Sequence, residues 1–391
     1  MRIAIVGQGY VGLPLAIAAA NAGHTVYGID TDSALIANLS RGESPIGDIT
    51  NAQIQSAFAS RRYFATTNFE SVKDAQIVVI CVPTPLDADY KPDLSSLKSA
   101  LTSVAQHLAP ETLVINESTV APGTTRSTIA SILEIAQVPF DLAYSPERID
   151  PANKVWNVTN TPKLVAGLTE QATERAKAFY ASFVESVTTG SSLEVIETAK
   201  LLENSFRLIN ISFINEIAQF CAAMNIDVRE VVDAASTKPY GFMPFYPSAG
   251  VGGHCIPVDP KYLSSKANEI GAPTRFIDLA HEVNISLPSY FLGVATGMIG
   301  DLANKKVLVV GVAYKPNVSD TRETPAEGLI ETLRKAGADV AWHDDLVQEW
   351  NGTTSAPLTN SYDLAILVNP HSHCDLSLLG STPTLNTRGG F

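Results

Sequence analysis

Short apolar runs alternate with helical stretches through the first half of the chain, and this alternation restricts the fold more than any other feature. The apolar runs are rich in β-branched residues and read as buried strands. Strands that alternate with helices require right-handed crossovers, so we predict an α/β fold with a doubly wound parallel sheet. The expected strands lie at residues 2–7, 24–30, 75–83, 112–119, 140–147, 162–168 and 183–190, with helical spacing at 11–22 and 94–108.

The pattern changes near Ser191 and returns near Lys305, which divides the chain of 391 residues into three expected parts. Residues 191–224 contain neither proline nor glycine, and their apolar residues spread over more than one helical face. Such a helix needs partners on several sides, so we expect it to bridge two domains and to pack against a second subunit. The predicted parts are an α/β domain at 1–190, a central helical region with a cysteine loop at 191–300, and a smaller α/β domain at 301–391.

Composition narrows the class of protein. Hydrophobic residues make up 45% and charged residues 17%, as in a folded globular protein. The net charge of −13 argues against a nucleic-acid partner, and no apolar run is long enough to span a membrane. Four scattered cysteines without CxxC pairing indicate a reducing compartment, so we expect a cytoplasmic protein without disulfides.

A glycine-rich turn, Gly7-Gln8-Gly9-Tyr10-Val11-Gly12, closes the first expected strand and opens the first expected helix. In such a turn the first glycine permits the bend, the second admits a pyrophosphate, and the third allows close packing. Asp30 ends the next strand, where its carboxylate would bind the ribose hydroxyls and repel a 2′-phosphate. The segment therefore predicts NAD as cofactor, and the alternative is a glycine turn without a ligand.

A cysteine stands in a constrained loop, 250-GVGGHCIPVDP-260. Gly252 and Gly253 remove side chains beside Cys255, and two prolines stiffen the segment. A thiolate beside an NAD site suggests covalent aldehyde oxidation, through a thiohemiacetal and a thioester to a carboxylate. The alternative is that Cys255 is a small buried hydrophobic residue.

Other polar residues could join the cysteine. Lys200 and Asn204 lie at i and i+4 on one helix face, and Glu147 and Thr119 follow expected strands, where α/β proteins place ligand groups. Taken alone, each has an ordinary alternative as part of a solvated surface. The segment His371-Ser372-His373-Cys374 could supply metal ligands, but no spaced partner motif occurs elsewhere, so we expect no metal.

Taken together, the motifs resemble the UDP-glucose/GDP-mannose dehydrogenase family. The matching segments follow the family's order over nearly the whole chain: GQGYVGLPLA, CVPTPLD, ESTVAPGTT, SPERI, ETAKLLENSFR, NEIAQFCAAMNIDVREV, GVGGHCIPVDP and GVAYKPNVSDTRETPA. The resemblance implies two Rossmann-like doubly wound domains joined by a long central helix, and a homodimer or higher homo-oligomer. It also implies oxidation of a nucleotide-sugar primary alcohol to a carboxylate with two NAD.

The GGHC form around Cys255 resembles the N-acetylhexosamine branch of the family. The resemblance therefore favours UDP-N-acetylglucosamine, then UDP-N-acetylmannosamine, then UDP-glucose as substrate. A two-electron alcohol dehydrogenase and a non-catalytic nucleotide-sugar-binding protein are the remaining alternatives.

The resemblance also assigns roles to residues. The implied catalytic residues are Cys255, Lys200, Asp259, Asn204, Glu147 and Thr119. The implied cofactor-binding residues are Gly7, Gly9, Tyr10, Val11, Gly12, Asp30, Thr84, Thr119 and Arg322. The implied substrate-binding residues are Glu147, Arg148, Lys200, Asn204, Tyr246, Gly250, Gly252, Lys315 and Arg275, the last reaching a neighbouring subunit's substrate.

Overall fold

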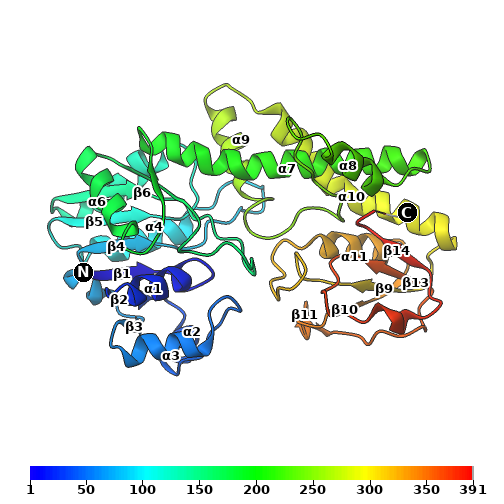
Figure 1. The fold of residues 1–391 in the computed structure, drawn as a ribbon, viewed down its shortest axis with the longest axis horizontal. Coiled ribbons are helices and arrows are strands. Elements are labelled where there is room, and N and C mark those ends of the chain that lie inside the picture. The colour runs from blue at the N-terminus through cyan, green and yellow to red at the C-terminus, as the bar shows by residue number, and fades with distance from the viewer. Residues whose placement is uncertain (390–391) are drawn as a thin grey trace. The chain divides into compact units, whose positions relative to one another are not determined.

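The protein consists of two compact units, Met1–Leu202 and Glu203–Phe391. A computed structural model describes residues 1–389. One uninterrupted helix, α7 (Leu193–Ala223), carries the chain through the boundary between the units (Figure 1). Within residues 1–389, no helix has both the length and the apolar character needed to cross a membrane.

The first unit is built on an eight-stranded sheet. Its strands are β1 (Arg2–Val6), β2 (Thr25–Ile29), β3 (Tyr63–Thr66), β4 (Ile77–Ile80), β5 (Thr112–Asn116), β6 (Phe140–Tyr144), β7 (Lys163–Gly167) and β8 (Val187–Thr189). The order in the sheet is β3-β2-β1-β4-β5-β6-β7-β8, so the winding direction reverses between β1 and β4. In doubly wound sheets, ligands bind outside the carboxyl ends of the strands at this reversal.

Both faces of this sheet are covered by helices. The long helices are α1 (Gly12–Asn21), α2 (Ser33–Ser40), α3 (Asn51–Ala59), α4 (Ser95–Ala105) and α6 (Glu170–Tyr180), and the short α5 spans Ala130–Leu133. In β1, Ile3 and Ile5 join the core with α1 and α6, whereas Ala4 and Val6 join the opposite core with α4. The alternation follows from the two-residue period of a strand and explains why β1 is apolar on both sides.

The expected strands of this unit are all present, with two differences from the prediction. The edge strand β3 has only four residues and is not recognised in the sequence. Strand β7 pairs antiparallel with β6. A parallel pair needs a long crossover connection, which is usually a helix. The connection at residues 145–162 contains no helix, and β7 runs in the direction opposite to β6.

The second unit contains a four-stranded parallel sheet in the order β10-β9-β13-β14. Its strands are β9 (Lys306–Val310), β10 (Asp339–His343), β13 (Leu364–Leu367) and β14 (Thr384–Asn386). Its other elements are α8 (Val228–Ser236), α9 (Asp259–Glu269), α10 (Arg275–Ile299), α11 (Pro325–Lys335), the short helix η4 (Leu376–Leu379) and the two-residue strands β11 (Glu349–Trp350) and β12 (Thr353–Thr354). Helices α10 and α11 contribute to the core on one face of this sheet.

The last described residues of the chain are held against the sheet of the second unit. Residues Thr384–Asn386 form β14, which pairs with β13. The Arg388 guanidinium then donates to Asn369 Oδ1 at 2.7 Å. Gly390 and Phe391 lie outside the described residues.

A buried ion pair that the sequence analysis does not identify connects strands of the first unit. Lys163 Nζ donates to Glu117 Oε2 at 2.6 Å and to the Pro146 carbonyl at 3.2 Å. The Tyr180 hydroxyl donates to the other Glu117 oxygen. Burial, and then the charge of Glu117, raise the pKa of Tyr180, so its hydroxyl remains a donor. The pair therefore joins the ends of β5 and β7 to the segment that carries Glu147.

We predict that Lys163→Met lowers the free energy of unfolding by about 3 kcal/mol, because it leaves the Glu117 carboxylate buried without its cation. The measurement is urea unfolding followed by circular dichroism. Lys177→Met is the matched control, since Lys177 pairs with Glu174 at 3.8 Å on the surface and should cost less than about 1 kcal/mol. Equal losses in the two variants would contradict the structural role of the buried pair.

Candidate active site

The glycine turn between β1 and α1 has glycine at three positions for two different reasons. Gly7 has φ +93°, and a Cβ there would lie 2.5 Å from the Cys81 carbonyl oxygen. A Cβ on Gly12 would collide with the Gly7 carbonyl. A Cβ on Gly9 would meet no protein atom within 4 Å, and its φ is not in the left-handed region. The protein itself therefore requires Gly7 and Gly12, whereas its packing gives no reason for Gly9, the position at which such turns admit a pyrophosphate.

Asp30 lies against this turn. Its Oδ2 accepts the Gln8 N–H at 2.8 Å and its Oδ1 accepts the Asp32 N–H at 3.0 Å. No side chain caps the start of α1, whose first turn also contains no acidic residue. Backbone N–H groups at such a helix start favour phosphate, and the held carboxylate suits a ribose. This geometry fits the dinucleotide that the sequence predicts.

Gln8 is a supporting residue that the sequence analysis overlooks. Its fully buried amide donates to the carbonyls of Ile5 and Gly7, and its Oε1 accepts the Tyr63 hydroxyl at 2.7 Å. Gly28 of β2 leaves the room for this amide, because a Cβ there would lie 2.5 Å from Gln8 Oε1. A glycine inside a strand often marks such a close approach and is the signal that could have identified Gln8.

The other predicted residues of the first unit also follow strands. Thr84 follows β4 and is buried, Thr119 follows β5 and is half-buried, and Glu147 and Arg148 follow β6. Strands β4, β5 and β6 run parallel to β1. Their carboxyl ends therefore lie on the same side of the sheet as the glycine turn. Tyr10 and Val11 lie in the turn itself, half-buried.

Lys200 of α7 is buried and approaches Glu147. Its ammonium donates to the Glu147 backbone carbonyl at 2.6 Å, and the two side chains form an ion pair at 3.9 Å. Lys200 is 4% exposed and Glu147 is 8% exposed. The predicted face of α7 is therefore buried at this position, where a charged pair can act on a ligand with little screening by water.

One helical turn before Lys200, Glu197 anchors α7. Its carboxylate is fully buried and accepts the Gly123 N–H at 2.6 Å and the Thr125 N–H at 2.9 Å. Burial raises the pKa of Glu197, and these bonds oppose the rise. This contact, which the sequence analysis does not predict, fixes the register of α7 against the segment that follows Thr119.

In the second unit, Cys255 is half-buried just before α9. Its carbonyl accepts the Asp259 N–H at 2.8 Å, so the loop already turns as a helix when it reaches Asp259. The Asp259 carboxylate is 1% exposed, and its Oδ2 accepts the Asn204 side-chain amide at 2.6 Å. The structure thus brings together two predicted catalytic residues, Asn204 and Asp259, beside the loop that carries the thiol.

Packing inside the protein gives the glycines of this loop a role of their own, beside the substrate contact that the resemblance implies for Gly252. A Cβ on Gly252 would lie 2.6 Å from the Glu323 carbonyl oxygen. A Cβ on Gly253 would lie 2.8 Å from the Tyr314 ring. Protein packing therefore excludes side chains at both positions. Gly250 has φ +136°, which favours glycine for its backbone conformation.

The remaining predicted substrate and cofactor residues lie in separate parts of the second unit. The Tyr246 hydroxyl donates to Asp233 Oδ1 at 2.8 Å, and Arg275 begins α10. Lys315 lies over the Tyr314 ring at 5.7 Å, in the segment after β9. Arg322 makes a bidentate ion pair with Asp320, with contacts of 2.6 to 3.0 Å.

A glycine turn with a carboxylate beside it, at the reversal of a doubly wound sheet, is typical of proteins that bind NAD. Three domain models of one family match successive parts of the chain. They are the NAD binding domain at residues 1–184, the central domain at 194–286 and the UDP binding domain at 308–376. The chain belongs to the UDP-glucose/GDP-mannose dehydrogenase family and is an NAD-dependent nucleotide-sugar dehydrogenase.

Individual relatives agree with the family. The chain is 36% identical to Protein CapL of Staphylococcus aureus, over 88% of this chain and 82% of CapL. It is 34% identical to the UDP-N-acetyl-D-glucosamine 6-dehydrogenase of Pseudomonas aeruginosa, over 95% and 91% of the two chains. Among solved structures, a UDP-D-ManNAc dehydrogenase from Pyrococcus horikoshii superposes with a TM-score of 0.91 at 30% identity, covering 99% of this chain and 95% of that one.

We predict that Asp30→Asn reduces the ratio of kcat/KM with NAD to kcat/KM with NADP by at least about tenfold, or ~1.4 kcal/mol. The neutral amide no longer repels a 2′-phosphate and binds the ribose hydroxyls less strongly. Initial rates with each cofactor measure the ratio. Asp32→Asn is the matched control, because the Asp32 side chain caps α2 and should leave the ratio unchanged. An unchanged ratio in Asp30→Asn would remove Asp30 from ribose selection.

Proposed function

We propose that the chain oxidises the C6 alcohol of a UDP-N-acetylhexosamine to a carboxylate, with UDP-N-acetylglucosamine as the first candidate. The observation that carries the proposal is the similarity to the Pseudomonas aeruginosa UDP-N-acetyl-D-glucosamine 6-dehydrogenase over 95% of the chain. UDP-N-acetylmannosamine is the second candidate, because the Pyrococcus horikoshii UDP-N-acetyl-D-mannosamine dehydrogenase is also 34% identical. UDP-glucose follows as a third candidate.

The chemistry requires two oxidations at one carbon. NAD, when bound, accepts one hydride in each oxidation. After the first, the alcohol is an aldehyde, and the Cys255 thiolate adds to its carbonyl carbon to form a thiohemiacetal. Loss of the second hydride leaves a thioester, and water then breaks the carbon–sulfur bond and restores the thiol. One alcohol, one water and two NAD⁺ thus give one carboxylate, two NADH and three protons.

Buried polar residues would assist these steps. The Lys200 ammonium is almost fully buried, so its charge would stabilise the oxyanion that develops at each addition. Asn204 holds the buried Asp259 carboxylate in one orientation, which suits it to position a water. Glu147 and Thr119 stand at strand ends of the NAD-binding unit, where they would handle water or protons near the reacting carbon.

We also propose a dimer formed through α7. Phe206, Phe213 and Phe220 recur every seven residues and are 44%, 56% and 60% exposed. A repeat of seven places them along one side of the helix, and a large exposed aromatic stripe is typical of an interface.

The oxidation is tested by counting NADH per sugar across a panel of UDP- and GDP-sugars. We expect two NADH per sugar, with the highest kcat/KM for a UDP-N-acetylhexosamine. Cys255→Ser should lower complete turnover by at least about 1,000-fold, ~4 kcal/mol at the transition state, while it still binds cofactor and sugar. Cys221→Ala is the matched control and should still yield two NADH. One NADH per sugar would indicate a two-electron dehydrogenase, and full turnover of Cys255→Ser would exclude the thioester.

We predict that Phe213→Glu weakens the dimer by at least about tenfold, because it places a charge in the apolar stripe. Sedimentation velocity over a range of protein concentrations measures the dissociation constant. Ile135→Glu replaces another exposed apolar residue, 64% exposed and outside α7, and should leave the constant unchanged. The proposal fails if both variants behave alike or if the parent protein is a monomer.

A further inference from the structure

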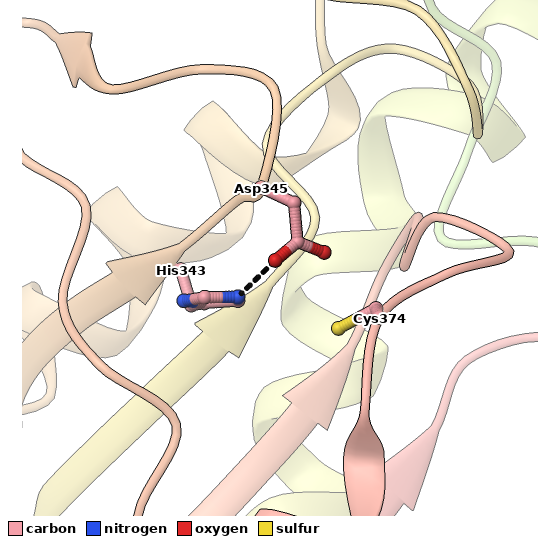
Figure 2. Close-up of side chains that lie close together, drawn as sticks. All are labelled: His343, Asp345 and Cys374. Atoms are coloured by element: carbon pink, nitrogen blue, oxygen red, sulfur yellow. Dashed lines mark hydrogen bonds and ion pairs between the residues drawn. The ribbon is translucent and has the colours of Figure 1, made fainter.

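Three side chains that commonly bind metal ions converge in the second unit, outside the residues assigned to the reaction. They are His343, Asp345 and Cys374, and Figure 2 shows them pointing toward one another. One ligand atom from each lies within 4.8 Å of the other two. Within residues 1–389, no other three His, Cys, Asp or Glu side chains place ligand atoms this close together.

Strand register explains why these residues meet. His343 and Leu367 both lie opposite Val310 of β9, so β10 and β13 end at the same level on its two sides. His343 is the last residue of β10, with Asp345 two residues further on. Cys374 lies between β13 and η4. The ligands therefore come from two segments, as they do in tetrahedral metal sites.

The hydrogen bond of His343 Nδ1 determines whether Nε2 is available as a metal ligand. Nδ1 lies 2.6 Å from the Ala356 carbonyl oxygen, which can only accept, so Nδ1 carries a proton. Nε2 lies 3.2 Å from Asp345 Oδ1. In the neutral ring, the lone pair of Nε2 faces Asp345 Oδ1, and the two groups repel each other. A cation between them would bind both atoms and remove this repulsion. A ring nitrogen that donates to a backbone carbonyl is also the usual support of a metal-bound histidine.

Asp345 provides a second, independent observation. Its Oδ2 is buried and accepts no hydrogen bond from an N–H or hydroxyl group of residues 1–389; His373 Nε2 lies 3.8 Å from it, and the Cys374 thiol interacts with the same carboxylate. A thiol is a weak donor, so burial of this oxygen is costly, and metal coordination would remove that cost.

Two histidines, His371 and His373, lie near this cluster and differ in how their ring nitrogens are engaged. His371 Nε2 bonds Asp344 Oδ1 at 2.7 Å, and its Nδ1 accepts the Asn317 N–H at 2.8 Å, so both nitrogens are engaged. His373 stacks on the His371 ring, and its side chain is 56% exposed. Its Nε2 lies 3.8 Å from Asp345 Oδ2, which makes it the candidate for a fourth ligand.

We propose that His343, Asp345, Cys374 and His373 bind one Zn²⁺-like transition-metal cation, which joins the loop after β10 to the loop after β13. A set with sulfur, imidazole and carboxylate suits zinc or cobalt and does not suit Mg²⁺ or Ca²⁺, which prefer oxygen ligands. Metal binding requires deprotonation of the Cys374 thiol, which is unfavourable because burial and the charge of Asp345 raise the pKa of Cys374 to about 12. The ion must displace that proton, as coordinated divalent cations do. The role is structural and independent of the proposed oxidation.

The test uses the full chain, purified without a metal-affinity tag and treated with a chelator. Co²⁺ is titrated in while the thiolate-to-cobalt charge-transfer band is recorded, and Zn²⁺ is then added in competition. We expect one equivalent of Co²⁺ to produce the band, Zn²⁺ to remove it, and one Zn²⁺ per chain to raise the Tm. Cys374→Ser should abolish the band, and His343→Gln should weaken Zn²⁺ binding by at least about 100-fold.

Two control measurements separate metal binding at Cys374 from binding at another thiol and from misfolding. Cys255→Ser should retain the band, because Cys255, with His254 beside it in the sequence, is another place where cobalt could meet a thiolate. Without metal, Cys374→Ser should melt near the parent's Tm, which separates lost binding from misfolding. The site is refuted if no band forms at one equivalent, as expected when His343 and Asp345 form a simple ion pair. It is also refuted if the band persists in Cys374→Ser.

Discussion

Burial of both faces of the parallel sheets is the constraint on which the rest of the structure depends. In the first unit, neighbouring residues of β1 enter opposite cores, so neither face can accept a polar ligand. Polar side chains can then gather only where the strands end. Gly9, Asp30, Thr119 and Glu147 all lie at carboxyl ends, and the reversal between β1 and β4 opens the place for a dinucleotide there.

This constraint also explains how much of the fold can be predicted from the sequence. Strands buried on both faces are continuous apolar runs, and every run assigned as a strand is one in the structure. The four-residue edge strand β3 is not predicted, because four residues are too few to show a clear apolar pattern. The antiparallel direction of β7 depends on the absence of a helix in the connection before it, a feature that apolar periodicity does not report.

The glycines show where reasoning about a site from sequence reaches its limit. Gly9 and Gly252 both stand in glycine-rich loops beside predicted functional residues, and sequence alone gives them the same explanation. In the structure a Cβ at Gly9 meets nothing, whereas a Cβ at Gly252 meets the backbone of Glu323. The structure therefore gives Gly252 a packing role that the sequence does not reveal, because the atom that a Cβ would meet there is distant in the chain.

The same limit applies to charged and metal-binding side chains. Lys163 meets Glu117 because β5 and β7 lie in one sheet, and Cys374 meets His343 because β10 and β13 flank β9 at matched register. Neither pairing has a fixed spacing in the sequence, so no local motif reveals it. Helical periodicity places Lys200 and Asn204 one turn apart on a single helix, but it is the family resemblance that assigns them to the predicted site. Neighbours within one helix are therefore predictable from spacing, whereas neighbours brought together by strand register become visible only when the sheet order is known.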